Sequence, residues 1–215
     1  MTKWVLIDED KVIREILEVD PGVGNKTWQK VHPKYEKFVR VGDTAKVVKE
    51  ADESLVTCLP LELEEGKEIV FGELASKRWE EQSKCIMYKG NLFNTDSASV
   101  SIINDKMTAL ASTKQMLDNQ AIAEEKEPIS NPSVNFKSKN GFVNLTYADF
   151  AAIKNAISLH VQHTFDTEMA IQSKIKTKIN FDDMVETFHN EVTKNNWNMF
   201  SFETKDFGVL PTMPS

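Results

Sequence analysis

Two consecutive helix starts near the end of the chain constrain the fold most strongly. Thr146 precedes Asp149 by three residues, the spacing at which a threonine and an acid cap the first turn of a helix reciprocally. Apolar residues then recur at helical spacing, at Phe150, Ile153, Ile157, Val161 and Phe165 and again at Ile171, Ile175 and Ile179. This pattern predicts a long amphipathic helix that begins near residue 147.

A second capped helix follows directly. Asn180 stands three residues before Asp183, which is a helix N-cap pattern. The apolar stripe of this helix consists of Phe181, Met184, Val185, Phe188 and Val192. Because so few residues separate the two helices, we expect them to fold back on each other as a helical hairpin.

Residues 1–72 have a β pattern instead. Runs rich in β-branched and aromatic residues at 4–7 and 11–17 flank an acidic turn, so they predict a hairpin. Further short strands are expected at 28–31, 38–41, 55–59 and 69–71. Asp20-Pro21-Gly22 and His32-Pro33 interrupt them, since proline and glycine break regular structure.

Helical and turn signals alternate in the middle of the chain. After Gly72 we expect a helix over 73–87 that buries Leu74, Ala75, Trp79 and Ile86. Gly90-Asn91 then predicts a small hairpin. A helix capped by Asp96 or Ser97 follows, with Val100, Ile103, Met107 and Leu110 on its apolar face, and the proline-containing acidic stretch 124–133 predicts an exposed loop or linker.

These patterns together predict an α+β fold. We expect a small antiparallel β module over residues 1–72 and a mainly helical domain with a helical hairpin over 73–195. Residues 196–215 form a separate aromatic tail.

The charge and cysteine content narrow the possible partners and compartments. The net charge is −7, which disfavours phosphate neutralisation, so we expect no nucleic-acid partner. Cys58 and Cys85 lie outside any C-x-x-C motif, as is typical of proteins made in a reducing cytosol. The apolar run Trp4–Ile7 is too short for a signal peptide or membrane span, so we expect a soluble protein without a membrane partner.

One histidine pair suggests a metal site. His160 and His163 are three residues apart on the predicted helix, and Asp166 and Glu168 follow within the next turn. The alternative is that both histidines flank the buried stripe and donate hydrogen bonds at a helix interface. Because no third ligand stands at a metal-site spacing, we expect no bound metal.

No other motif indicates catalysis or a cofactor. Gly22–Thr27 superficially resembles a phosphate-binding loop, but Asn25 and Asp20 stand where that loop requires glycine. No Gly-x-Ser-x-Gly elbow occurs, and neither cysteine lies in a recognisable nucleophile motif. We therefore expect no cofactor and a protein that is not an enzyme.

The tail after the last helix is a candidate interaction segment. It is apolar but has neither a period of two nor one of 3.6, so it does not predict a self-sufficient element. It either folds back over its own core or docks on a partner. Its candidate protein-interaction residues are Trp197, Met199, Phe200, Phe202 and Phe207.

Several motifs together resemble an uncharacterised domain family encoded in bacteriophage tail and tail-fibre gene clusters. They are Lys77-Arg-Trp79, Gly90-Asn-Leu-Phe-Asn-Thr-Asp-Ser-Ala-Ser99, Leu145-Thr-Tyr-Ala-Asp-Phe150 and His160-Val-Gln-His-Thr-Phe-Asp-Thr-Glu168. The resemblance covers roughly residues 73–180. Two features depart from it: Lys174-Ile-Lys-Thr-Lys178 replaces a small, alanine-rich stretch, and the aromatic tail has no counterpart.

The resemblance implies a setting and no catalytic mechanism. It implies a structural protein of a phage tail, baseplate or tail fibre, made in the host cytoplasm and retained in the virion. Its expected partners are other phage tail or fibre proteins and further copies of itself, as a homo-oligomer. Two alternatives stay open: a tail-fibre assembly chaperone that leaves the particle, and a metal-dependent enzyme built on His160 and His163.

Overall fold

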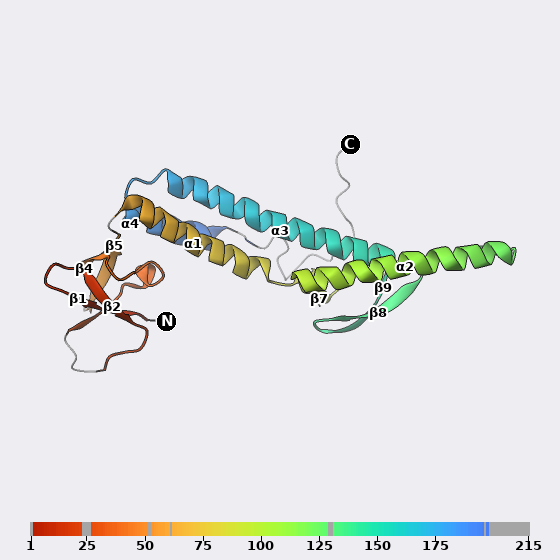
Figure 1. Ribbon diagram of the computed structural model, residues 1–215, viewed down its shortest axis with the longest axis horizontal. Coiled ribbons are helices and arrows are strands. Elements are labelled where there is room, and N and C mark those ends of the chain that lie inside the picture. Colours follow the sequence, from red (N-terminus) through yellow and green to blue (C-terminus); the bar gives the residue numbers. More distant parts are fainter. Residues whose placement is uncertain are drawn as a thin grey trace. The chain divides into compact units, whose positions relative to one another are not determined.

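The computed structural model describes residues 2–22, 27–50, 53–60, 62–128, 131–195 and 197. It confirms the α+β class, because short antiparallel strands precede and separate long helices (Figure 1). The elements are β1 (Trp4–Ile7), β2 (Ile13–Leu17), β3 (Trp28–Lys30), a 3-10 helix (Pro33–Tyr35), β4 (Thr44–Glu50), β5 (Glu53–Leu59), α1 (Leu63–Gln82), β6 (Ile86–Tyr88), β7 (Asn91–Phe93), α2 (Ser97–Ala123), β8 (Ser133–Ser138), β9 (Gly141–Thr146), α3 (Tyr147–Lys176) and α4 (Phe181–Lys194).

Contacts divide the described chain into two compact units that are not consecutive in sequence. The first takes its residues from 1–78 and 167–196, and the second from 79–166 together with Trp197. Helices α1 and α3 therefore contribute residues to both units. Within the described ranges, no helix is long and apolar enough to cross a membrane.

The predicted hairpin at the amino end of the first unit is confirmed. β1 pairs antiparallel with β2 and with β3, in the order β2-β1-β3. The acidic turn closes without glycine because the Asp8 carboxylate accepts a hydrogen bond from the Val12 backbone N–H at 2.8 Å and pairs with Arg14. β4 and β5 form a second antiparallel pair, of which only β5 was expected.

The strand predicted at 38–41 is wrong. Pro33 begins a 3-10 helix, and the backbone N–H of Phe38 then donates to the Tyr35 carbonyl oxygen at 2.9 Å. This turn directs the Phe38 ring into the core of the first unit, where it lies edge-on to Phe181 and Phe188. The aromatic residue therefore fills a core position from a turn.

The strand predicted at 69–71 and the helix start at 73 are also wrong, because α1 runs unbroken from Leu63 to Gln82. Its buried positions Gly66, Val70, Leu74 and Arg78 are four residues apart, so one helix face is covered. Trp79 lies off this face and is 61% exposed, contrary to the predicted stripe.

The second unit contains two hairpins. β6 and β7 confirm the hairpin predicted at Gly90-Asn91, with the turn at Lys89 and Gly90, which both have positive φ. The β8–β9 hairpin was missed in the sequence. Its Asn140-Gly141 dipeptide between alternating apolar residues is a strong hairpin signal.

Helix α2 begins as predicted, with the Asp96 carboxylate accepting from the Ser99 backbone N–H at 2.8 Å. Its first apolar positions, Ile103 and Leu110, join the core of the second unit. That core also takes side chains from both hairpins and from the start of α3, including Phe93, Leu145, Phe150, Ile153 and Ile157.

The N-terminal cap of α3 is confirmed as a reciprocal pair. The Thr146 backbone N–H donates to Asp149 Oδ2 at 2.9 Å, and the Asp149 N–H donates to Thr146 Oγ1 at 3.3 Å. The stripe prediction holds through Ile157 and again at Ile171 and Ile175, which are buried. It fails at Phe165 and at Ile179, beyond the end of α3, where the side chains are 45% and 84% exposed. Between Ile157 and Ile171 polar residues occupy the buried face instead: His160, Thr164 and Thr167.

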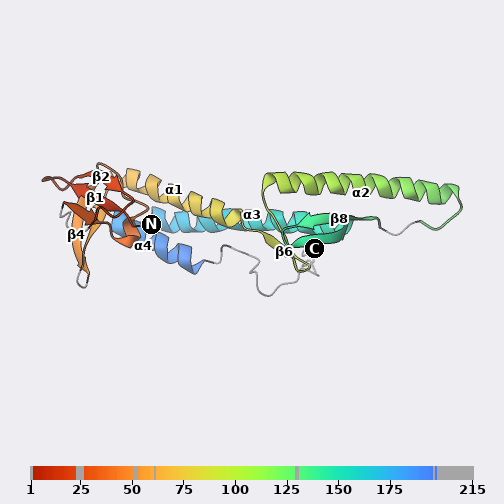
Figure 2. The same cartoon turned by 90° about the horizontal axis from the view of Figure 1, so that it is seen from below.

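Helix α4 and the end of α3 confirm the helical hairpin within the first unit (Figures 1 and 2). The Asn180 side chain accepts from the Asp183 backbone N–H at 2.8 Å. The α4 residues Phe181, Met184, Val185 and Phe188 are buried as predicted.

We predict that Asp149 makes stability depend on pH. Burial alone would raise the pKa of its carboxyl, but hydrogen bonds from Lys89, Thr146 and Tyr88 outweigh burial and hold the pKa well below its usual range. The stabilisation is therefore complete above the unfolded-state pKa of about 3.9 and is lost as the pH falls toward the lower folded-state pKa.

Urea unfolding of wild type and Asp149→Asn at several pH values tests this. We expect the variant to be less stable at pH 7 and to lose less stability than wild type between about pH 5 and pH 2. Asp105→Asn, which removes an exposed carboxylate of α2, is the matched control. Parallel losses in wild type and Asp149→Asn would contradict the prediction.

Candidate functional site

The aromatic tail contributes one described residue. Trp197 is buried, with 4% of its surface exposed, and belongs to the second unit. Met199, Phe200, Phe202 and Phe207 lie outside the described residues. Their role in protein interaction stays a prediction from the sequence.

The first histidine of the suggested metal site has a structural partner. His160 is fully buried, and its Nε2 atom lies 3.1 Å from the Glu81 carbonyl oxygen, so the ring donates a hydrogen bond from α3 to α1 within the second unit. Burial lowers the pKa of His160, which favours the neutral ring. This agrees with the interpretation of His160 as a hydrogen-bond donor at a helix interface.

The acids that follow the histidines also have other partners. Glu168 Oε2 lies 2.6 Å from Arg78 Nε in a nearly buried ion pair between α3 and α1 of the first unit. Asp166 accepts a hydrogen bond from Gln162 at 2.8 Å. In the described part of the chain, no group of three or more His, Cys, Asp or Glu side chains is placed to hold a metal ion.

Other residues of the quoted motifs have structural positions in the second unit. Gly90 adopts the positive φ of the hairpin turn, and Phe93 is buried in the core. The Thr95 hydroxyl donates to the Gln82 carbonyl oxygen at 2.6 Å, and Asp96 caps α2 through Ser99. These motif residues therefore build the scaffold.

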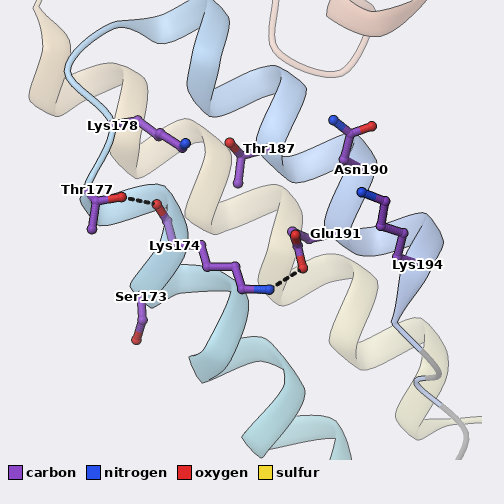
Figure 3. Close-up of a pocket in the computed structure, with 8 residues that line it drawn as sticks. All are labelled: Ser173, Lys174, Thr177, Lys178, Thr187, Asn190, Glu191 and Lys194. Carbon is purple, nitrogen blue, oxygen red and sulfur yellow. Dashed lines mark hydrogen bonds and ion pairs between the residues drawn. The ribbon is translucent and has the colours of Figure 1, made fainter.

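A polar groove of about 420 Å³ lies between α3 and α4 of the first unit. Figure 3 shows Lys174 directed at Glu191, and their charged atoms are 2.6 Å apart. The hydrogen bond from Lys174 lowers the pKa of Glu191. Lys178 and Lys194 also line the groove, so its charge is predominantly positive.

The second unit has two neighbouring grooves along α2. One, of about 500 Å³, is lined by Leu110, Ala111, Lys114, Gln115, Asp118, Asn119, Asn131, Pro132 and Tyr147. The other, of about 390 Å³, is lined by Asn104, Met107, Thr108, Ala111, Ser112, Gln115, Tyr147 and Lys154. Both include Ala111, Gln115 and Tyr147, so the two grooves border the same stretch of the helix.

The C-terminal half of α2, residues 111–123 and hereafter the distal half, is the most exposed long segment of helix in the second unit. It extends past the β8–β9 hairpin in both views (Figures 1 and 2). Ala121 is buried and Lys114, Leu117 and Asp118 are half-buried, whereas the remaining residues are exposed, including Met116 at 61% and Ile122 at 69%.

This exposed helix is almost free of charge. From Met107 to Ala123 the charged residues are Lys114 and Asp118, and these two pair with each other at 2.7 Å. Exposed helices usually have charged faces, whereas the centres of protein interfaces are depleted of charge. The distal half therefore has the composition of an interaction surface, a signal that was present in the sequence and was missed.

We predict that the Arg78–Glu168 ion pair matters for folding because both side chains are nearly buried. Arg78→Ala leaves the Glu168 carboxylate without its cation and should cost about 3–5 kcal/mol of unfolding free energy. Replacing both residues, as Arg78→Met with Glu168→Leu, removes both charges and should cost less than Arg78→Ala alone.

Denaturant unfolding of these variants measures the difference. Lys174→Ala, which removes the more exposed ion pair with Glu191, is the control and should change stability by about 1 kcal/mol or less. A double variant less stable than Arg78→Ala would show that packing, and not charge compensation, dominates at this position.

Of the comparisons with known proteins, the one with family models gives a match. A family model described as Domain of unknown function (DUF4376) matches residues 65–189, which is more than half of the chain. No curated protein and no solved structure matches. The matched segment includes nearly all of α1, then α2, α3, the β6–β9 hairpins and most of α4. The expectation of an uncharacterised domain family is confirmed, and the chain belongs to the family described as Domain of unknown function (DUF4376).

Proposed function

We propose that this chain is a structural subunit of a bacteriophage tail, baseplate or tail fibre that acts through protein–protein contacts. The phage setting rests on the resemblance of the motifs at Gly90–Ser99 and His160–Glu168. The contact role rests on one observation above the others: the distal half of α2 is exposed, nearly uncharged and bordered by grooves.

The positions of the motif residues support a structural role. A motif that marks a catalytic centre places several of its polar groups around a shared space that a substrate can enter. Here Asp96 caps a helix, His160 donates to a buried carbonyl and Glu168 pairs with Arg78. Each group satisfies the backbone or a neighbouring charge, as a scaffold requires.

The alternatives differ in the fate of the protein or in its chemistry. A tail-fibre assembly chaperone would use the same kind of surface but leave before the particle is complete. A metal-dependent enzyme would use His160 and His163. The buried hydrogen bond of His160 and the ion pair of Glu168 favour the structural role over the enzyme.

The chain should be found in finished phage particles. Quantitative mass spectrometry of particles purified from the phage that encodes it should detect the protein in a fixed ratio to the major tail proteins. As a control, the lysate of the same infected cells should contain it as well. Presence in the lysate and absence from particles would favour the chaperone, and particles that assemble normally without its gene would contradict a structural role.

A further inference from the structure

The distal half of α2 lacks most of the packing that usually stabilises a helix of its length. Thirteen residues of helix are about 20 Å long and of marginal stability in water without packing. Ile103 and Leu110 join α2 to the core and are seven residues apart, so they lie on one face of the helix. This seam continues at Leu117, seven residues further on, and at Ala121 after another four. Leu117 is only half-buried, so the seam continues past the body of the second unit incompletely covered.

The net charge of α2 favours a second copy of this chain as the partner that covers this seam. The helix contains Asp105, Lys106, Lys114 and Asp118, so its net charge is zero in a chain of net charge −7. An acidic or basic partner would find no complementary charge on it. A second copy of the same helix can approach without like-charge repulsion.

The Lys114–Asp118 pair is also complementary to itself under two-fold symmetry. In a two-fold interface, any contact from residue i to residue j is repeated from j to i. An antiparallel copy centred on this stretch brings Lys114 of each chain beside Asp118 of the other. The Lys114 side chain is 43% exposed and that of Asp118 is 29% exposed, so a second copy can reach both charged groups.

The antiparallel direction also keeps the second units of the two copies from overlapping. The first half of α2 packs on its own core, and the distal half extends past it (Figure 2). When two distal halves overlap in opposite directions, the core of each second unit lies beyond the C-terminal end of the other copy's α2. The groove at Leu110, Ala111 and Tyr147 then accepts side chains from the copy.

We propose that the distal half of α2 pairs antiparallel with the distal half of a second copy of this chain, with reciprocal Lys114–Asp118 contacts. This proposal deepens the proposed function by naming a partner for its interaction surface. It is nevertheless tested on the purified protein alone, so a monomeric chain would refute the pairing and leave the presence of the protein in phage particles open.

The test is a charge-reversal experiment on the full chain by sedimentation equilibrium over a range of concentrations. Wild type should dimerise. In a dimer of either single variant, Lys114→Asp or Asp118→Lys, like charges face each other at both of the two symmetry-related contacts. Each variant should therefore dimerise at least about tenfold more weakly than wild type. An equimolar mixture of the two variants restores opposite charges at both contacts, and it should form heterodimers of nearly wild-type affinity.

Two controls separate pairing from folding. The double variant Lys114→Asp with Asp118→Lys keeps an opposite-charge pair within the helix and across the two-fold axis, so it should dimerise like wild type. Circular dichroism should show the same helix content in the single variants at concentrations where wild type is also monomeric. A monomeric wild type, single variants that dimerise normally, or a mixture that does not recover would each overturn the proposal.

Discussion

The buried face of α3 is the constraint on which the rest of the structure depends. It is apolar where it enters the core of the second unit, at Phe150, Ile153 and Ile157, and again in the first unit, at Ile171 and Ile175. Between these stretches the buried positions are polar. Buried polar groups cost free energy unless they find partners. Thr164 finds its partner within α3, at the Val161 carbonyl oxygen, and other polar groups depend on the elements that pack there.

Helix α1 supplies two of these partners, one in each unit. In the second unit the Glu81 carbonyl oxygen accepts the hydrogen bond of His160, and in the first unit Arg78 pairs with Glu168. A polar contact is specific in direction and position, whereas apolar packing tolerates sliding. The ion pair explains why α1 keeps Arg78 on a face that apolar residues would otherwise occupy, whereas the contact with His160 uses the backbone of Glu81 and does not depend on its side chain.

The same polar stretch explains where prediction from the sequence succeeded and failed. Helix caps depend on side chains three residues apart, so Thr146, Asp149 and Asn180 were identified without tertiary information. Apolar periodicity located the ends of the buried face of α3 but continued it to Phe165, because nothing in the pattern marks His160 as buried. In α1 a local Ile69-Val70-Phe71 run suggested a strand, and packing of the whole helix overrode it.

The candidate site was only half predictable for a related reason. The first half of α2 has an apolar stripe and was placed correctly, but the distal half has mostly uncharged side chains that match neither a core nor a charged surface. Its significance appears once its exposure is known. An exposed helix of zero net charge beside a groove suits the symmetric contact proposed above.

Hydrogen–deuterium exchange at two protein concentrations tests this account most directly. If a second copy covers the distal half of α2, backbone amides of residues 111–123 should exchange faster after dilution below the dissociation constant. Amides of the buried part of α3, at 150–160, should exchange at the same rate in both samples. The same protection of residues 111–123 in both samples, with the diluted sample shown to be monomeric, would contradict the account.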